Sequence, residues 1–395
     1  MSNPVPVGWS ARLFSDAVTL VYGKSPKDIL ENDGAYPVIG TGGITGVTNS
    51  FLHEGKTTVI GRKGTINKPS YIETKFWAID TTYYVTNYKS TDPKWFFYLL
   101  QDIDLTKYNE ASGVPSLNRD TLYAIPYISP PLPEQQIIAK ILTAVDEVIE
   151  KTQAQIDKLK DLKTGMMQEL LTQGVGVDGK PHTEFKDSPV GRIPKAWSVV
   201  AISSLCSHIV DCVNKTAPVV DSVTPYKMLR TSNIRHGRVD TKNVRYVTED
   251  TYKNWTRRLT PAIGDLIFTR EAPVGECGVL EDADGVFLGQ RTMMYRADLH
   301  KTTPHFLMYS LMSEYGKKQL EDFSGGSTVP HMRVPDCEKI LIKVPPKTEQ
   351  DLIVDAIRSV DRSIYVKQLK AHKLADKKKA LMQDLLTGKV RVTID

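Results

Sequence analysis

Two long segments of the chain carry apolar residues at alternating spacings of four and three, the pattern of an amphipathic helix. The apolar stripe of the first segment consists of Ile138, Leu142, Val145, Ile149, Ile156, Leu159, Met166 and Leu170. The stripe of the second segment consists of Ile353, Ile357, Val360, Ile364, Ala371, Leu374, Leu381 and Leu385. A stripe that keeps its phase over about five heptads predicts a coiled coil.

The two segments are copies of each other. Shifted by 215 positions, residues 130–172 align with residues 345–387 without a gap, and 18 of the 43 aligned pairs are identical. Each helix would be roughly 58 Å long at about 1.5 Å per residue, too long for burial within one ordinary domain. We therefore expect the two copies to pair with each other. The pattern leaves open the alternative that each helix lies separately on its own domain.

The charge distribution along the two segments favours an antiparallel pair. Both copies begin with acidic residues and end with basic ones, which suits the helix dipole and also places the acidic start of one helix beside the basic end of the other. A parallel pair would bring Lys163 directly against Lys378. In an antiparallel pair we expect each of these lysines to lie opposite apolar residues that its aliphatic stem covers.

The regions outside the helices contain short β-rich runs separated by Gly, Asn and Pro, which predicts strand-rich mixed domains. The second region begins with Pro-Lys-Ala-Trp197-Ser, which repeats the Pro-Val-Gly-Trp9-Ser of the first. The repeat unit is therefore a domain with its helix, and the predicted fold class is α+β: two pseudo-repeated mixed α/β domains separated by two long antiparallel coiled-coil helices. The predicted boundaries are 1–130 (first domain), 131–174 (first helix), 175–190 (connector), 191–344 (second domain), 345–388 (second helix) and 389–395 (tail).

Composition and cysteine usage narrow the class of protein. The chain has 395 residues, of which 25% are charged, and it contains no membrane-spanning apolar run and no visible secretory signal. Its four cysteines form no close CxxC pair, which argues against a zinc cluster and fits a reducing compartment. We therefore expect a soluble cytoplasmic protein without a metal site.

The candidate chemistry is cationic. A net charge of +5 permits nucleic-acid binding, and residues 227–258 gather nine basic residues against three acidic ones, although a solvated surface explains such a stretch equally well. The turn Gly61-Arg62-Lys63-Gly64 puts two cations where a DNA backbone or base edge can approach. The glycine cluster of residues 40–46 lacks the spacing of a phosphate loop, so a tight turn is the preferred interpretation. The candidate DNA-binding residues are Arg62, Lys63, Gly64, Arg230, Arg270, Gln290 and Arg291, and structural salt bridges are the alternative for the charged ones.

Several further stretches carry a family resemblance. They are Pro-x-x-Trp at each domain start, Gly42-Gly43-Ile-Thr-Gly46, Arg62-Lys63-Gly64, Ser116-Leu-Asn-Arg119-Asp-Thr-Leu122, Pro131-Leu-Pro-Glu134-Gln135 and the connector from Phe185 to Trp197. In the order domain, helix, domain, helix, the chain resembles the DNA specificity subunit of a type I restriction-modification system, over almost its whole length. It departs from the repeat where His331-Met-Arg333-Val334 stands in the place of Ser116-Leu-Asn-Arg119.

The resemblance implies two target-recognition domains, each reading one half of a bipartite target in double-stranded DNA, with the helices setting the spacer between the halves. It implies partners as well: two methyltransferase subunits docked on the helices, which bind S-adenosylmethionine, and restriction subunits that use ATP and Mg to cleave foreign DNA. The chain itself would have no catalytic residue, cofactor or metal, and the sequence contains neither an Asn/Asp-Pro-Pro-Tyr/Phe motif nor a Walker lysine motif. The alternative interpretation is a coiled-coil scaffold or adaptor protein without DNA specificity.

Overall fold

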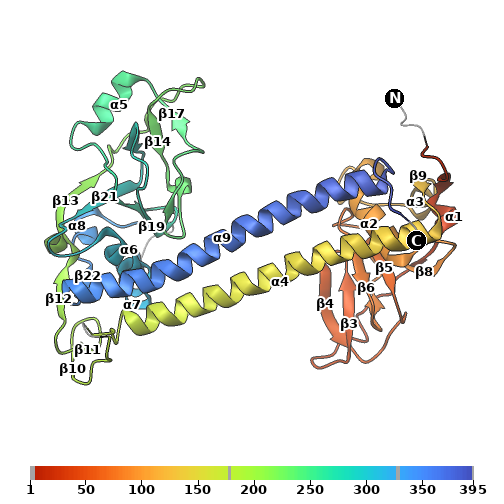
Figure 1. The fold of residues 1–395 in the computed structure, drawn as a ribbon, viewed down its shortest axis with the longest axis horizontal. Helices are drawn as coiled ribbons and strands as arrows, with labels where there is room; N and C mark the ends of the chain where they lie inside the picture. Colours follow the sequence, from red (N-terminus) through yellow and green to blue (C-terminus); the bar gives the residue numbers. More distant parts are fainter. Residues whose placement is uncertain (1–4, 177–178, 326–329, 394–395) are drawn as a thin grey trace. The chain divides into compact units, whose positions relative to one another are not determined.

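The computed structural model describes residues 5–176, 179–325 and 330–393, so two residues of the predicted connector and the last two of the predicted tail lie outside it. The chain forms two compact units (Figure 1). Unit 1 comprises residues 1–155 and 367–395, and unit 2 comprises residues 156–366. Each unit contains one mixed domain, here called the first and the second domain, and about half of each of the two long helices, α4 (Leu132–Leu170) and α9 (Lys347–Leu386).

The first domain is built on two sheets. A four-stranded sheet has the order β2 (Val18–Tyr22), β8 (Thr82–Tyr88), β5 (Thr57–Gly61), β6 (Ser70–Ile72). A three-stranded sheet has the order β4 (Gly43–Thr48), β3 (Tyr36–Gly40), β7 (Trp77–Ala78). The remaining elements are β1 (Ser10–Leu13), which pairs with β9 (Pro126–Ser129), and the helices α1 (Phe14–Ala17), α2 (Pro93–Asp102), η1 (Leu105–Tyr108) and α3 (Arg119–Tyr123).

The second domain repeats this plan. Its four-stranded sheet has the order β13 (Cys206–Asp211), β21 (Thr292–Ala297), β18 (Leu266–Arg270), β19 (Val274–Val279), and its three-stranded sheet has the order β17 (Arg245–Tyr246), β14 (Lys227–Leu229), β20 (Val286–Leu288). The short pairs are β12 (Ser198–Ala201) with β22 (Leu341–Val344), β15 (Ile234–Arg235) with β16 (Arg238–Val239), and β10 (Phe185–Lys186) with β11 (Ile193–Pro194). The helices are η2 (Ile202–Leu205), η3 (Thr231–Asn233), α5 (Glu249–Thr256), α6 (Pro304–Met312), α7 (Glu314–Ser324) and α8 (Val334–Cys337).

The pairing directions show that the two domains share one topology. In each domain the central strand of the small sheet, β3 or β14, pairs in parallel with one neighbour and antiparallel with the other. The main core helix begins in the same way in both: Asp92 caps α2 and Thr303 caps α6, and a proline follows each cap. The predicted pseudo-repeat is therefore present in the fold. The second domain differs by the η3 and β15–β16 segment inserted between β14 and β17, and by α5.

The long helices pack antiparallel. In unit 1, Ile138 and Leu142 near the start of α4 share a core with Met382 and Leu385 near the end of α9. In unit 2 the relationship is reversed, because Met167 at the end of α4 shares a core with residues near the start of α9. Each helix start thus lies beside the other helix's end, which confirms the predicted α+β fold with a pair of long helices.

The predicted stripe residues differ in burial. Six of those proposed for the helix seam are buried: Ile138, Leu142, Ile353, Ile357, Val360 and Ile364. Four are half-buried: Val145, Ile149, Leu159 and Leu374. At the end of α4 the buried positions are Met167 and Leu171 rather than Met166 and Leu170, because this last turn belongs to the core of the second domain as well as to the helix pair.

The expectation that Lys163 and Lys378 lie opposite apolar residues is wrong. Lys163 forms an ion pair with Asp361, and Lys378 forms one with Asp146. The acidic residues therefore lie on the seam itself, next to the apolar stripe. A half-buried ammonium group is more stable beside a carboxylate than beside methyl groups, which explains the arrangement.

The same two side chains join each domain to its helix. In unit 1, Trp9 Nε1 donates a hydrogen bond of 3.0 Å to Glu134 Oε2, and in unit 2, Trp197 Nε1 donates one of 3.0 Å to Glu349 Oε2. Both carboxylates are completely buried. We call these contacts the Trp–Glu junctions.

The remaining partners of the two buried carboxylates differ. Arg391, in the segment that follows α9, forms an ion pair with Glu134, with Nε 2.8 Å from Oε1. Glu349 instead accepts hydrogen bonds of 2.9 Å from the backbone N–H groups of Val175 and Gly176, and its Oε1 lies 2.9 Å from His182 Nε2. In each unit the segment that follows one helix thus completes the junction at the start of the other.

Candidate nucleic-acid interface

The turn that contains Arg62 is held between two other segments of the first domain. Its backbone N–H donates to the Thr81 carbonyl at 2.8 Å, and its carbonyl accepts from the Leu117 N–H at 2.9 Å. Gly64 donates to the Pro115 carbonyl at 2.8 Å and has a φ of +88°, in the left-handed region that favours glycine. Arg62, Lys63 and Gly64 therefore extend beyond the end of β5 in a fixed conformation.

The side chains of this turn are not neutralised by acids. Arg62 Nη1 donates to the Asp80 carbonyl at 3.2 Å, and its guanidinium lies 5.2 Å from the centroid of the Tyr22 ring. Lys63 is exposed. Within the part of the chain that the structure describes, no carboxylate is within ion-pair distance of either cation, so the salt-bridge alternative is not realised for them.

Arg270 occupies the position in the second domain that Arg62 occupies in the first. Its N–H donates to the Arg291 carbonyl at 2.9 Å, as that of Arg62 donates to Thr81, and its carbonyl accepts from the Met332 N–H at 2.9 Å. The next residue, Glu271, forms a bridge with His331, as Lys63 does with Ser116. The two arginines are thus equivalent in strand register.

The second-domain candidates lie at one end of the strands but are partly engaged. Arg270 is half-buried, and its Nη1 donates to the Met332 carbonyl at 3.1 Å. Arg291 is exposed and its Nε lies 3.4 Å from Glu271 Oε1, so this residue does form an ion pair. Gln290 is exposed and its Oε1 accepts from Thr216 Oγ1 at 3.1 Å.

Arg230 reaches the same end through the small sheet. Leu229 is the register partner of Leu288, and Gly289 donates to the Leu229 carbonyl at 2.8 Å, so the chain after β14 runs beside the chain that leads to Gln290. Arg230 is half-buried and its Nε has no hydrogen-bond partner among the described groups. We call Arg62, Lys63 and Gly64 the first edge, and Arg230, Arg270, Gln290 and Arg291 the second edge.

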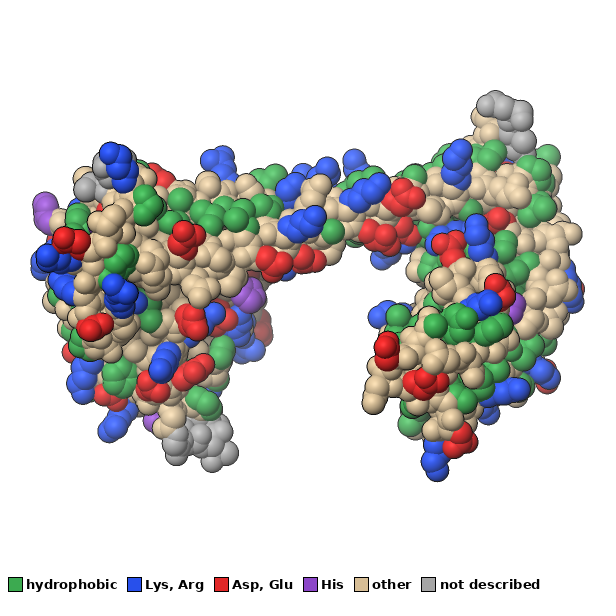
Figure 2. All heavy atoms as spheres, turned by 90° about the horizontal axis from the view of Figure 1, so that it is seen from below, with side chains coloured by type: hydrophobic (Ala, Val, Ile, Leu, Met, Phe, Trp, Pro, Cys, Tyr) green, Lys and Arg blue, Asp and Glu red, His purple; other side chains and the backbone are tan. Residues whose placement is uncertain are grey.

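Much of the basic stretch 227–258 is occupied within the protein. Lys227 pairs with Asp282, Lys253 with Glu249 and Arg258 with Asp211. The guanidinium of Arg238 lies 4.0 Å from the centroid of the Tyr365 ring on α9. On the face shown in Figure 2, Lys and Arg side chains are interspersed with Asp and Glu on each unit. The interface candidates are therefore individual cations in fixed turns. The net charge of residues 227–258 overstates how many of its cations are available to contact DNA.

The glycine cluster of residues 40–46 forms the turn of the β3–β4 hairpin, as expected, with Gly40 paired with Gly43. Two residues that the sequence did not single out as DNA candidates lie at the first edge. Tyr22 ends β2, Arg119 begins α3, and the guanidinium of Arg119 lies 5.3 Å from the Tyr22 ring centroid. Their separation in the chain hides this contact, and only the Ser-Leu-Asn-Arg119 motif pointed to the segment.

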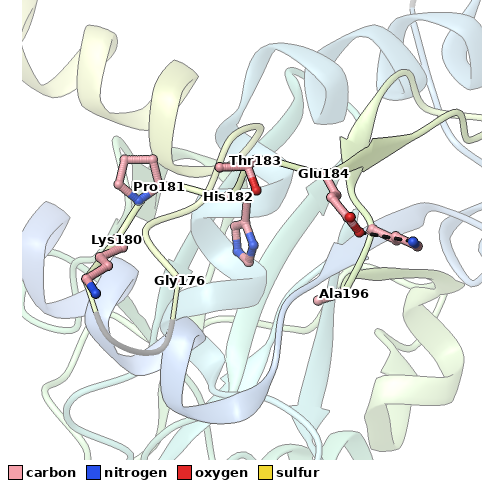
Figure 3. Close-up of a pocket in the computed structure, with 8 residues that line it drawn as sticks. Gly176, Lys180, Pro181, His182, Thr183, Glu184 and Ala196 are labelled. Atoms are coloured by element: carbon pink, nitrogen blue, oxygen red, sulfur yellow. Dashed lines mark hydrogen bonds and ion pairs between the residues drawn. The ribbon is translucent and has the colours of Figure 1, made fainter.

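A hollow of about 630 Å³ in unit 2 lies along the connector (Figure 3). It is lined by Gly176, Lys180, Pro181, His182, Thr183, Glu184, Lys195 and Ala196. Its polar side chains interact with the protein, because Lys195 Nζ lies 3.0 Å from Glu184 Oε2 and His182 contacts the buried Glu349. This hollow is part of the joint between the connector and the second domain.

No residue set typical of metal binding is found in the described ranges 5–176, 179–325 and 330–393. They contain no group of three or more His, Cys, Asp or Glu side chains placed to hold a metal ion. The four cysteines are unpaired with one another, and burial raises the pKa of the Cys277 thiol to about 12, far from that of a nucleophilic thiolate. None of the described helices is long and apolar enough to cross a lipid bilayer.

Comparison with known proteins gives consistent matches. The family model for the type I restriction modification DNA specificity domain matches residues 6–161 and 194–374. The type I restriction enzyme MjaVIII specificity subunit of Methanocaldococcus jannaschii is 28% identical over 407 residues, covering 98% of this chain and 94% of that protein. The crystal structure of the S subunit of a type I restriction-modification system from M. genitalium has a TM-score of 0.66 at 13% identity and covers 100% of this chain and 98% of its own, which shows a shared fold.

A second solved structure concerns complex assembly and conformational transition of the type I restriction-modification system. It has a TM-score of 0.52 at 14% identity and covers 98% of this chain and 100% of its own. The family match includes both copies of the repeat, and the structure contains the domain-and-helix unit twice. The chain therefore belongs to the type I restriction-modification DNA specificity family, and it is a non-catalytic specificity subunit that recognises the DNA target of such a system.

Proposed function

We propose that each domain reads one half of a bipartite target in double-stranded DNA, with the first edge at one half-site and the second edge at the other. The observation that carries this proposal is the equivalence in register of Arg62 and Arg270. A duplicated scaffold that presents an arginine at the same place twice suits two separate contacts with DNA. The surrounding residues differ, as two different half-sites require. Membership of a DNA specificity family sets aside the alternative of a scaffold without DNA specificity.

The major groove is the surface of DNA where every base pair presents a distinct pattern of donors and acceptors. An arginine fork suits the O6 and N7 atoms of guanine, and lysine and backbone N–H groups suit phosphates. The first edge combines a stacked arginine, an exposed lysine and a glycine turn, so it contains both kinds of group. We propose that Arg62 and Arg270 read bases and that Lys63 contacts a phosphate.

The helices provide the docking surface for other subunits. The chain functions in assembly with modification and restriction subunits, to which S-adenosylmethionine, ATP and Mg belong. We propose that two methyltransferase subunits dock on the helices. Apolar side chains are exposed there, at Val148, Leu162, Leu352, Tyr365, Val366 and Leu369. Apolar side chains exposed along both helices favour a protein partner over solvent. We place the assembly in the cytoplasm, where it has access to DNA.

The proposal that each domain reads its own half-site is tested by exchanging domains. Residues 1–130, or separately residues 191–344, are replaced by the equivalent domain of a relative, and the methylated sites of the assembled enzyme are mapped across a genome. Each exchange is expected to change one half-site and to leave the other unchanged. If either exchange altered both half-sites, the two domains would not be independent readers and the proposal would be wrong.

A further inference from the structure

Two arginines contact one tyrosine ring at the first edge. Tyr22 is the last residue of β2 and 42% of it is exposed. The guanidinium of Arg62 lies 5.2 Å from the ring centroid and that of Arg119 lies 5.3 Å from it. Both distances are typical of a cation–π contact. Three elements distant in sequence, β2, the turn after β5 and the start of α3, thus meet at one side chain.

The tyrosine ring is supported from inside the domain. Tyr22 is the register partner of Tyr83, and the two ring centroids are 4.9 Å apart. Tyr83 is buried, and its hydroxyl donates to the Leu117 carbonyl at 3.1 Å. Burial raises the pKa of Tyr83 to about 12, so its hydroxyl keeps the proton that it donates to Leu117. The orientation of Tyr22 is therefore set by a buried side chain that is itself hydrogen-bonded to the Arg119-containing segment.

The charge of this arrangement is not balanced within the described residues. No carboxylate there pairs with Arg62 or with Arg119, and Arg119 Nε is buried without a hydrogen-bond partner. Two cations against one ring repel each other, and an unpaired buried N–H carries a desolvation cost. A ligand rich in acceptor atoms would remove both penalties. A guanidinium stacked on a ring keeps its in-plane N–H groups available for such acceptors.

We propose that Tyr22 is a positioning residue that holds the guanidinium groups of Arg62 and Arg119 against a guanine edge in the first half-site. The inference rests on the function proposed above and adds Arg119 as a second base-reading residue. The fixed orientation of the guanidinium group favours contact with a base over contact with a phosphate. A phosphate contact needs a cation within reach, whereas a bidentate contact with O6 and N7 needs a guanidinium in a fixed plane. The ring contact and the hydrogen bond to the Asp80 carbonyl fix that plane for Arg62.

The second domain lacks this device, which supplies a control within the same chain. The register counterpart of Tyr22 is Asp211, which is opposite Met293 and pairs with Arg258. The counterpart of Arg119 at the shift of 215 is Val334. Arg270 is held by the Met332 carbonyl instead of a ring. Changes at Tyr22 should therefore act on the first half-site alone.

The experiment measures binding of the complex with its modification subunits to duplexes in which each position of both half-sites is varied. The variants are Tyr22→Leu, Tyr22→Phe, Arg119→Ala and, as the control, Asp211→Asn. Tyr22→Leu and Arg119→Ala are expected to lower discrimination about tenfold or more at the same base pair of the first half-site. Tyr22→Phe should retain discrimination because the ring remains, and Asp211→Asn should leave the first half-site unchanged.

Three results would overturn the inference. The first is that Tyr22→Leu weakens binding equally on all sequences, which would make the arginines phosphate contacts. The second is that Tyr22→Phe loses discrimination. The third is that Tyr22→Leu and Arg119→Ala act at different base pairs. Thermal unfolding of each variant checks that the domain is intact. If Tyr22→Leu does not fold, the double variant of Arg62→Ala and Arg119→Ala decides, because two residues at one base pair give effects that are not additive. Each of these failures leaves the domain-exchange result intact, whereas failure of the proposed function would appear in the exchange itself.

Discussion

Lys163 Nζ lies 2.7 Å from Asp361 Oδ1, across the helix pair in unit 2. In unit 1 their counterparts at the shift of 215 make the same contact, with Lys378 Nζ also 2.7 Å from Asp146 Oδ1. Each aspartate also accepts a hydrogen bond from a domain tyrosine, Tyr309 in unit 2 and Tyr98 in unit 1. The same pair of side chains therefore aligns the antiparallel helices twice and connects each alignment to a domain.

Removal of one aspartate should weaken the helix pairing. Asp361→Ala leaves the ammonium group of Lys163, which is only 16% exposed, without its carboxylate. We expect a loss of about 1–2 kcal/mol of unfolding free energy, between the values for surface and buried pairs. Chemical unfolding measures it, with Glu147→Ala as the control, because Glu147 pairs with Lys151 on an exposed face. Equal losses in the two variants would show that the Lys163–Asp361 pair does not stabilise the helices.

Truncation of the stripe should depend on burial. Leu142 is completely buried, so Leu142→Ala should cost about 2–5 kcal/mol of unfolding free energy. Leu159 is half-buried, so Leu159→Ala should lose less unfolding free energy. Leu162 is 50% exposed on the same helix, so Leu162→Ala should lose almost none. Unfolding curves of the three variants give the order directly. A Leu162→Ala loss as large as that of Leu142→Ala would contradict the assignment of the packed face.

The equivalent arginines should affect opposite half-sites. Arg62→Ala is expected to cost about 1–3 kcal/mol of binding free energy and to relax selectivity in the first half-site only. Arg270→Ala should do the same in the second half-site. Binding to duplexes varied at each position distinguishes the two effects. Uniform weakening on every sequence would demote either residue to a phosphate contact. Melting temperatures are needed for Arg270→Ala, because its side chain also supports the Met332 carbonyl.

The contribution of the segment after α9 can be measured at Arg391. Its guanidinium pairs with the buried Glu134, so Arg391→Ala should lower the midpoint of thermal unfolding. Adding Glu134→Gln to that variant removes the uncompensated charge and should recover part of the loss. No recovery in the double variant would mean that the contact acts through packing of the side chain and not through charge.

The expectation from the sequence that the helices set the spacer between the half-sites can be tested by a matched insertion. Gln155 and Lys367 face each other, with Lys367 Nζ 2.7 Å from Gln155 Oε1, and they mark the boundary between the two units. Four helix-forming residues inserted after Gln155 and four before Lys367 preserve the pairing inside each unit. At about 1.5 Å per residue the helices lengthen by roughly 6 Å, nearly two base-pair steps.

We expect the mapped methylation sites of this variant to keep both half-sites and to gain one or two unspecified base pairs between them. Insertion into α4 alone is the control, because it puts the two helices out of register and should reduce activity. An active double-insertion variant with an unchanged spacer would show that the helices do not determine the distance.

The long helices could be predicted from the sequence because their information is local. The spacing of Ile138, Leu142 and Val145 defines a face without reference to the rest of the chain. The aspartate partner of Lys163 could not be found in this way, because it lies on the other helix and outside the apolar stripe. The sequence predicted even less about the arrangement of residues within the domains. Arg62 and Arg270 are 208 positions apart, not 215, because the loops between strands differ in length, so the shift that aligns the helices does not align these residues.

Contacts such as that of Arg62 and Arg119 with Tyr22 depend on tertiary packing, which no periodicity encodes. The boundaries of the compact units also do not coincide with those of the predicted segments. The sequence suggested helices as separate elements, whereas the structure divides each helix between two units near Gln155 and Lys367. The division follows from antiparallel packing, because each domain is in contact with the start of one helix and the end of the other.

The Trp–Glu junctions have a consequence for how such a gene can change. The codons between those for Trp9 and Glu134, and between those for Trp197 and Glu349, encode every residue of the two edges and none of the four junction side chains. Recombination inside these limits, with a relative or between the two copies, would replace the surface that we propose contacts DNA and keep the tryptophan and the carboxylate that attach it. Under the proposed function, a new methylation pattern would then be accessible through an exchange of coding segments, without any compensating change in the helices.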